Sequence, residues 1–172
     1  MLYHRSMPRD LDPSLAVFLE RFKAILLEGF GPDLVSLALY GSYARGTSRP
    51  ESDIDLLAVV EDGTTEPRER AVTASLRAED TVEYGRLKNG GLGPILSCPV
   101  LTRAEAVEFH WIYLDMVEEA VLLHDKGGFL KNRLQELARK LAELGSRRTV
   151  LPDGSWYWDL KPGLRPGEVI EL

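Results

Sequence analysis

The sequence predicts an α/β fold: a small mixed sheet with flanking helices, extended at the C-terminus by a helix and a β-hairpin. Three observations carry this prediction. Apolar runs of strand length alternate with longer segments of helical periodicity along the 172 residues. Hydrophobic residues make up 44% of the chain and charged residues 28%, a composition that supports a packed core. Because Cys98 is the single cysteine, an internal disulfide framework and a cysteine-ligated zinc site are excluded.

Residues 13–30 are predicted to form the first helix, because large apolar residues recur there at helical spacing and Gly29, Gly31 and Pro32 follow them. Two apolar runs, 34–40 and 53–60, are too short for good helices. We interpret both as buried strands.

The middle of the chain is predicted to contain two helices around a third strand. The first helix begins at Pro67, has Thr64 or Thr65 as its N-cap and runs to about residues 84–87. A strand is predicted over 95–101, and Pro99 within it indicates a sheet edge or a bulge. Thr102 and Glu105 form a capping-box pattern, which predicts one long, largely buried helix from 102 to about 123.

Past Gly127 and Gly128, leucines at alternating four- and three-residue steps predict an amphipathic helix over 130–144 with Gly145 after its end. Residues 149–158 are predicted to form a β-hairpin around Asp153-Gly154. We therefore expect a domain over residues 1–125 and an extension over 126–172 packed on it.

Composition also limits the partners. The chain has 21 basic and 27 acidic residues, which gives a net charge of −6. This balance argues against broad binding of duplex nucleic acid. No apolar run approaches the roughly 18 residues of a membrane span. The start of the chain lacks the apolar segment of a signal peptide. We expect a cytoplasmic protein.

The residues that could bind a ligand or take part in a reaction lie between 41 and 55. Residues two apart on a strand share a face, about 6.6–6.8 Å apart along the chain, so Asp53 and Asp55 are expected to project together. Two carboxylates on one face suit a Mg²⁺ or Mn²⁺ ion that also binds phosphate oxygens. The preceding Gly41-Ser42 turn could open a short helix whose free N–H groups attract an anion. Together they predict a site for a metal–nucleoside triphosphate complex.

These residues resemble a known family. Gly41-Ser42, then Ala44-Arg45-Gly46, then Ser52-Asp53-Ile54-Asp55-Leu56 are similar to the signature of the polymerase-beta-type nucleotidyltransferases, above all its small prokaryotic members. The resemblance implies that Gly41 and Ser42 hold the triphosphate and that Asp53 and Asp55 bind the catalytic metals. A second Asp-x-Asp, Asp10-Leu11-Asp12, has no glycine turn before it and no strand after it, and we interpret it as a solvated approach to the first helix.

The chain departs from the family pattern in one respect. The family has a third carboxylate on a later strand, where it helps to deprotonate the attacking hydroxyl. The candidate strand here, Ile95 to Leu101, contains no acid. The nearest acids are elsewhere in the sequence: Glu61, Asp62, Glu79, Asp80 and Glu83. The departure puts catalysis in question, and it predicts that Ser97 or Cys98 faces the aspartate pair.

Other features have two interpretations each. Arg45 is a candidate nucleotide-binding residue that could reach a phosphate, or a solvated turn arginine. His110 and His124 are packing or surface residues rather than a metal pair, because no third ligand accompanies them. The leucines of 130–144 suit packing on their own domain better than a homo-oligomer seam. The aromatic residues 156–158 either stack on a base or, as we favour, fix the hairpin.

The sequence thus predicts a metal-dependent enzyme that moves a nucleoside monophosphate from a nucleoside triphosphate to an acceptor hydroxyl. The alternative is a catalytically weakened nucleotide-binding or antitoxin-like module that acts through a helical protein partner. The sequence selects neither the nucleotide nor the acceptor.

Overall fold

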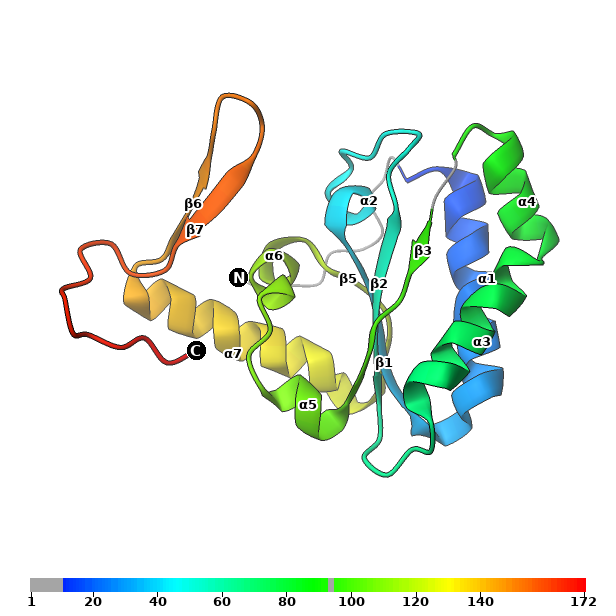
Figure 1. Ribbon diagram of the computed structural model, residues 1–172, viewed down its shortest axis with the longest axis horizontal. Helices are drawn as coiled ribbons and strands as arrows, with labels where there is room; N and C mark the ends of the chain where they lie inside the picture. The colour runs from blue at the N-terminus through cyan, green and yellow to red at the C-terminus, as the bar shows by residue number, and fades with distance from the viewer. Residues whose placement is uncertain (1–10, 93–94) are drawn as a thin grey trace.

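A computed structural model describes residues 11–92 and 95–172, and in them a mixed sheet separates two layers of helices (Figure 1). The central strands β1 and β2 are antiparallel, β5 joins the outer side of β1, and β3 and β4 run parallel to β2 along its other side. The strands of this sheet are β1 (Leu34–Tyr40), β2 (Ile54–Val60), β3 (Leu96–Ser97), β4 (Val100–Thr102) and β5 (Val121–Asp125).

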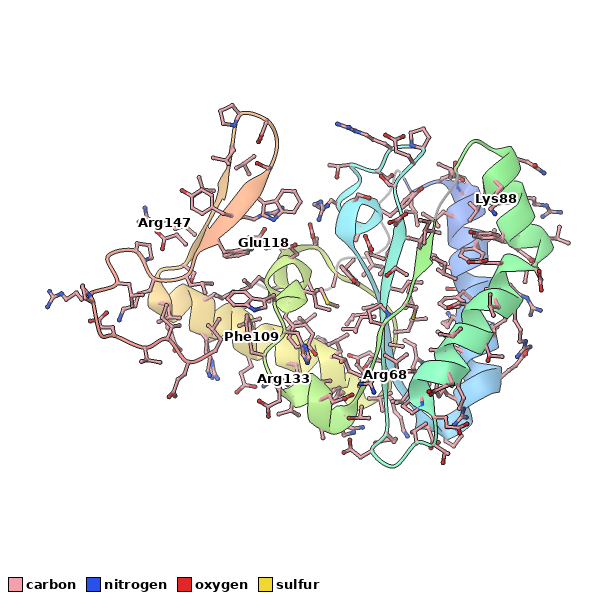
Figure 2. All side chains as sticks on the ribbon, viewed as in Figure 1. Arg68, Lys88, Phe109, Glu118, Arg133 and Arg147 are labelled. Carbon is pink, nitrogen blue, oxygen red and sulfur yellow. The ribbon has the colours of Figure 1, made fainter. Side chains whose placement is uncertain are left out.

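One face of the sheet is covered by α1 (Pro13–Phe30), α3 (Pro67–Glu79) and α4 (Val82–Asn89), and the other by α5 (Arg103–Val107), α6 (Ile112–Glu119) and α7 (Phe129–Leu144). The short α2 (Gly41–Arg45) connects β1 to the loop before β2, and 3₁₀ turns occupy Gly31–Asp33 and Lys126–Gly128. The hairpin of β6 (Arg147–Val150) and β7 (Trp156–Asp159) projects beyond α6 and α7. In Figure 2, Arg68 lies on the α3 side of the molecule, whereas Phe109 and Arg133 lie on the α7 side.

Alternation along β2 decides which side chains meet which helix layer. Ile54 and Leu56 belong to the core under α1, whereas Leu57 belongs to the core with α6 and α7. Because successive strand residues point to opposite faces, Asp55 lies on the α6 side of the sheet.

The mixed α/β fold is confirmed. So are the first helix, the strand 34–40, the short helix at the Gly41-Ser42 turn, the helix that ends before Gly145, and the hairpin. Gly145 adopts the left-handed conformation, with φ of 69°, that favours glycine after a helix. Within the described residues, no helix is long and apolar enough to cross a membrane.

The prediction of one helix from 102 to about 123 is wrong. The capping box of Thr102 and Glu105 is present, but α5 ends at Val107, and after α6 the chain forms β5. β5 pairs antiparallel with β1, with Leu39 opposite Val121. A segment that is apolar on most sides fits a buried strand as well as a buried helix, and pairing with β1 decided between them.

The segment 67–87 also differs from its prediction. The helix breaks after Glu79, because Thr81 accepts a hydrogen bond from the Tyr84 amide and starts α4. Glu66, rather than Thr64 or Thr65, precedes α3, and it has a positive φ of 49°.

The strand predicted over 95–101 is split into β3 and β4 on either side of Cys98 and Pro99. This break agrees with the interpretation of Pro99 as marking an edge or irregularity, because both pieces pair only with β2 among the described residues.

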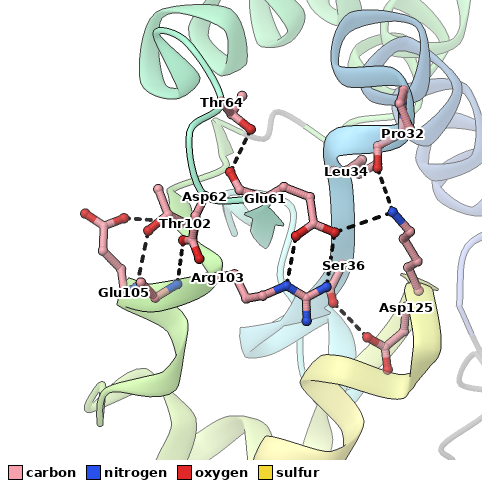
Figure 3. Close-up of polar contacts among 12 residues, drawn as sticks. Pro32, Leu34, Ser36, Glu61, Asp62, Thr64, Thr102, Arg103, Glu105 and Asp125 are labelled. Carbon is pink, nitrogen blue, oxygen red and sulfur yellow. Dashed lines mark hydrogen bonds and ion pairs between the residues drawn. The ribbon is translucent and has the colours of Figure 1, made fainter.

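A polar network lies at the edge of the sheet where β2 and β5 end (Figure 3). Arg103 donates two hydrogen bonds to Glu61, at 2.9 and 3.1 Å, and Lys126 donates to the Pro32 carbonyl. The Asp125 carboxylate accepts from the Ser36 hydroxyl and from the Leu130 and Lys131 amides, so it fixes the start of α7 to β1.

The predicted division of the chain into a domain over 1–125 and an extension over 126–172 stays a prediction.

Candidate functional site

Gly41 and Asp55 meet where β1 ends and β2 begins. Gly41 has a φ of 73°, and a Cβ atom at this position would overlap Oδ2 of Asp55. Tyr40 is the register partner of Asp55 across the antiparallel pair, which brings the turn directly beside the carboxylate. The glycine is therefore required twice, for its backbone conformation and for the space that the carboxylate occupies.

Asp55 lies in a surrounding that disfavours its charge. Burial raises its pKa, and the nearby Asp53 carboxylate raises it further, while the Arg45 guanidinium acts in the opposite direction. Asp53 therefore lies within electrostatic range of Asp55, and the expectation that the two carboxylates project together stays a prediction. Asp55 is half-buried and Asp53, which precedes β2, is exposed. A divalent cation would relieve the repulsion within such a pair.

The short helix α2 begins at the Gly41-Ser42 turn. Its end is closed by Gly46, which has a φ of 76°, and the Thr47 amide donates to the Ser42 carbonyl at 3.0 Å. The polar loop that follows is also a folded turn, because the Arg49 amide donates to the Ser52 hydroxyl at 2.8 Å. These local bonds set where Asp53 enters β2.

The third-strand position beside Asp55 is Ser97. β2 and β3 pair in parallel with Asp55 opposite Ser97 and Ile54 opposite Leu96, so Ser97 and Asp55 share a face. Cys98 packs against the core on the other face. Of the two residues predicted to face the aspartate pair, the structure selects Ser97.

The described residues hold no cluster of three His, Cys, Asp or Glu side chains that could bind a metal. Glu61 lies at the far end of β2 from Asp53, across seven residues at about 3.3 Å each, and it is paired with Arg103. Two carboxylates nevertheless suit Mg²⁺, which commonly takes one or two of them and completes its shell with water and substrate phosphates. The donor set therefore fits a metal–nucleotide complex and not a metal held by protein alone.

Arg45 points from the end of α2 toward α6. Its Nη1 lies 2.6 Å from Oε1 of Glu119, which is only 2% exposed. Burial raises the pKa of Glu119, and Arg45 opposes that rise. The guanidinium also lies over the ring of Trp156 in the hairpin, 4.5 Å from its centroid.

The two histidines lie in different parts of the fold. His110 Nε2 lies 2.9 Å from the Glu105 carbonyl oxygen, whereas His124 is in β5, 3.3 Å from the Leu34 carbonyl oxygen. Burial raises the pKa of the Cys98 thiol to about 12, which argues against a nucleophilic thiolate.

Sequence reasoning missed Tyr43 and Glu119. Tyr43 is buried, and its hydroxyl has no hydrogen-bond partner within the part of the chain that the structure describes. Burial raises its pKa, with Asp12 and Asp53 adding to the effect. The only sequence signal for Tyr43 is its place inside the Gly-Ser-x-Ala-Arg-Gly segment. Glu119 gives no such signal, because its pairing with Arg45 spans 74 positions.

Comparison with known proteins finds a matching family model and a similar protein. A family model described as a nucleotidyltransferase domain matches residues 19–121. MJ1305 of Methanocaldococcus jannaschii, named as a candidate protein adenylyltransferase, is 28% identical over 127 residues, covering 74% of this chain and 80% of that protein.

Solved structures of similar shape include a complex of a tri-AMPylated HEPN toxin with an MNT antitoxin from Shewanella oneidensis. This chain aligns with it at a TM-score of 0.44 and 14% identity, over 76% of this chain and 92% of that one. A candidate nucleotidyltransferase from Sulfolobus solfataricus aligns at a TM-score of 0.35 and 21% identity, over 70% and 95%.

Replacing Asp55 by Asn should stabilise the metal-free protein at pH 7. The raised pKa means that ionising Asp55 costs folding free energy above that pKa, and asparagine carries no charge. We expect a melting temperature a few degrees higher at most at pH 7, measured by thermal unfolding in metal-free buffer, since roughly 1 kcal/mol moves it by about 2–4 °C in a chain of this size.

The gain should shrink as the pH falls through the raised pKa and vanish by about pH 3, where Asp55 is largely protonated in both the folded and the unfolded state. Asp153→Asn is the matched control, because hydrogen bonds from Ser155 lower the pKa of that exposed carboxyl and its loss should not stabilise. A gain for Asp55→Asn that persisted at pH 3 would contradict the electrostatic explanation.

Proposed function

The chain belongs to the nucleotidyltransferase domain family, and on this premise we propose that it transfers a nucleoside monophosphate from a nucleoside triphosphate to an acceptor hydroxyl with a divalent cation. The observation that carries the proposal is the junction of Gly41 with Asp55, which brings the Gly-Ser turn against one of the two aspartates. Neither the Gly-Ser turn nor the Asp-x-Asp pair is specific evidence for this function when it occurs alone. Side by side, they would provide a phosphate-binding turn and a cation-binding pair.

Asp53 and Asp55 would hold Mg²⁺ or Mn²⁺ together with the triphosphate oxygens. The bound cation supplies charge neutralisation for the triphosphate and for the departing pyrophosphate. The Gly41-Ser42 turn would orient the phosphates, with the Ser42 hydroxyl donating a hydrogen bond. The acceptor oxygen then forms a bond to the α-phosphorus, the bond from that phosphorus to the bridging oxygen breaks, and the hydroxyl proton leaves to a base or to water.

The nucleotide we propose is ATP and the acceptor a protein side-chain hydroxyl. The support is the relative of Methanocaldococcus jannaschii, whose name describes a protein adenylyltransferase and which matches 74% of this chain. The sequence left the acceptor open, so this choice rests on that relative alone.

Ser97 favours slow transfer. A serine hydroxyl cannot take a proton at neutral pH, so general-base assistance worth about 10²–10⁴-fold is absent at this position. Positioning and charge neutralisation remain, and transfer at phosphorus depends chiefly on these. The same observation favours a second candidate function: a nucleotide-binding, antitoxin-like module that acts on a helical protein partner, by modifying or by binding it.

The direct test incubates the protein with each labelled nucleoside triphosphate and Mg²⁺ and follows self-labelling and pyrophosphate release. ATP should bind and label slowly, and Asp53→Asn should reduce Mg²⁺-ATP affinity at least about tenfold, because one of the two proposed cation ligands loses its charge. Asp80→Asn, an exposed acid after α3, should bind as the parent does. Equal Mg²⁺-ATP affinity in Asp53→Asn and the parent would refute the proposed site.

A carboxylate introduced at position 97 should accelerate transfer. Ser97 shares a face with Asp55, so Ser97→Asp restores a proton acceptor beside the pair, and turnover should rise toward about 10²-fold with little change in nucleotide affinity. Ser75→Asp makes the same change on α3, outside the site, and should leave turnover unaltered. Rapid transfer by the parent protein alone would show that the missing base is not limiting.

A further inference from the structure

The helix α2 links the proposed nucleotide site to the C-terminal hairpin. The Gly41-Ser42 turn opens this helix and Arg45 closes it. The five residues of α2 span only about 7.5 Å, so both ends must move together. Whatever holds Arg45 therefore also limits where the turn can lie.

Arg45 is held on two sides. Its guanidinium forms an ion pair with the buried Glu119 carboxylate of α6 at 2.6 Å. It also lies 4.5 Å from the centroid of the Trp156 ring, which belongs to β7. The helices α2 and α6 are also in contact with each other. The ion pair therefore joins two packed helices, and the ring contact connects the hairpin to them.

Trp156 is the hairpin residue that contacts Arg45. The guanidinium of Arg148 also lies 4.5 Å from the centroid of its ring, so two cations contact one indole. The indole N–H donates to the Asp115 carboxylate at 3.0 Å, and Arg148 pairs with Glu118 at 2.7 Å. Figure 2 shows Glu118 beside the hairpin, on the side where α6 lies.

The hairpin depends on these contacts. A two-stranded hairpin alone is marginally stable in water, so its position must come from what its side chains touch. Alternation along β7 directs Trp156 toward α6 and leaves Tyr157 on the outer side, 52% exposed. Trp156 therefore links the hairpin to α2, and Tyr157 does not.

We propose that the C-terminal hairpin positions the nucleotide-binding turn, acting through Trp156 on Arg45 and so on α2. Arg45 is then a positioning residue, tied to Glu119 and Trp156, and not a phosphate ligand. The proposal rests on the proposed function for its effect on nucleotide, but the mechanical link from hairpin to turn is independent of it. Loss of Trp156 should loosen residues 41–46 and weaken nucleotide binding.

The test compares Trp156→Ala with Tyr157→Ala, the neighbouring residue of the same strand that faces outward. Amide hydrogen exchange of residues 41–46 is measured without nucleotide, with β1 amides as the check that the sheet stays folded. Mg²⁺-ATP affinity is measured by calorimetry in parallel. Trp156→Phe keeps an aromatic face for Arg45 and should restore most of the parent behaviour.

In Trp156→Ala, exchange at 41–46 should rise and affinity should fall, each by about three- to thirtyfold, the range that loss of one cation–π contact produces. Tyr157→Ala should change neither. The link is overturned if exchange at 41–46 is the same in both variants. If the parent binds no nucleotide, the proposed function fails while the exchange comparison still decides the link.

Glu119→Gln separates the two roles of Arg45. A positioning role predicts weaker Mg²⁺-ATP binding, because the ion pair that holds α2 on α6 is lost. A phosphate-binding role predicts equal or tighter binding, because the guanidinium charge is released toward the nucleotide. Equal or tighter binding in Glu119→Gln, with the sheet amides protected as in the parent, would overturn the assignment.

Discussion

The Asp55 carboxylate occupies space that any side chain at position 41 would need. This single steric constraint joins the end of β1, the start of α2 and the start of β2, because Gly41 directly follows Tyr40, the register partner of Asp55 in the antiparallel pair of β1 and β2. The Gly-Ser turn and the aspartate pair, separated by a ten-residue connection, thereby become one site. Asp55 remains half-buried there, with a pKa raised by burial and by Asp53, and a cation bound as proposed would offset that cost of its charge.

The charges around this junction are distributed unevenly between its two sides. On the side of β3, the residue beside Asp55 is the neutral Ser97, which leaves no base where the family pattern has one. On the side of α6, Arg45 is neutralised by Glu119 and covered by Trp156. Under the proposed function, the β3 side would affect the rate of transfer, and the α6 side would affect how firmly the Gly41-Ser42 turn is held.

The sequence was sufficient for the elements that carry the signature. Short apolar runs separated by glycine predicted β1 and β2, which carry Tyr40 and Asp55 to the site. Prediction from sequence failed where the local pattern is ambiguous. The apolar run Val121 to Leu123 suits a strand as well as a helix, and pairing with β1 made it a strand. Sequence reasoning also could not predict the contact of Arg45 with Glu119 and Trp156, because these residues are brought together only by the tertiary fold. The reason that position 41 is glycine was likewise only half visible, since the close approach of Asp55 depends on strand register.

The constraint between Gly41 and Asp55 is measured most directly by a double-mutant cycle on the free energy of unfolding, with Gly41→Ala, Asp55→Ala and the double variant. Gly41→Ala alone should cost more than the roughly 1 kcal/mol expected from its positive φ, because the new Cβ meets the carboxylate. In the Asp55→Ala background the carboxylate is absent, and the cost should fall by about 1 kcal/mol or more. Additive costs, with Gly41→Ala equally destabilising in both backgrounds, would contradict the account.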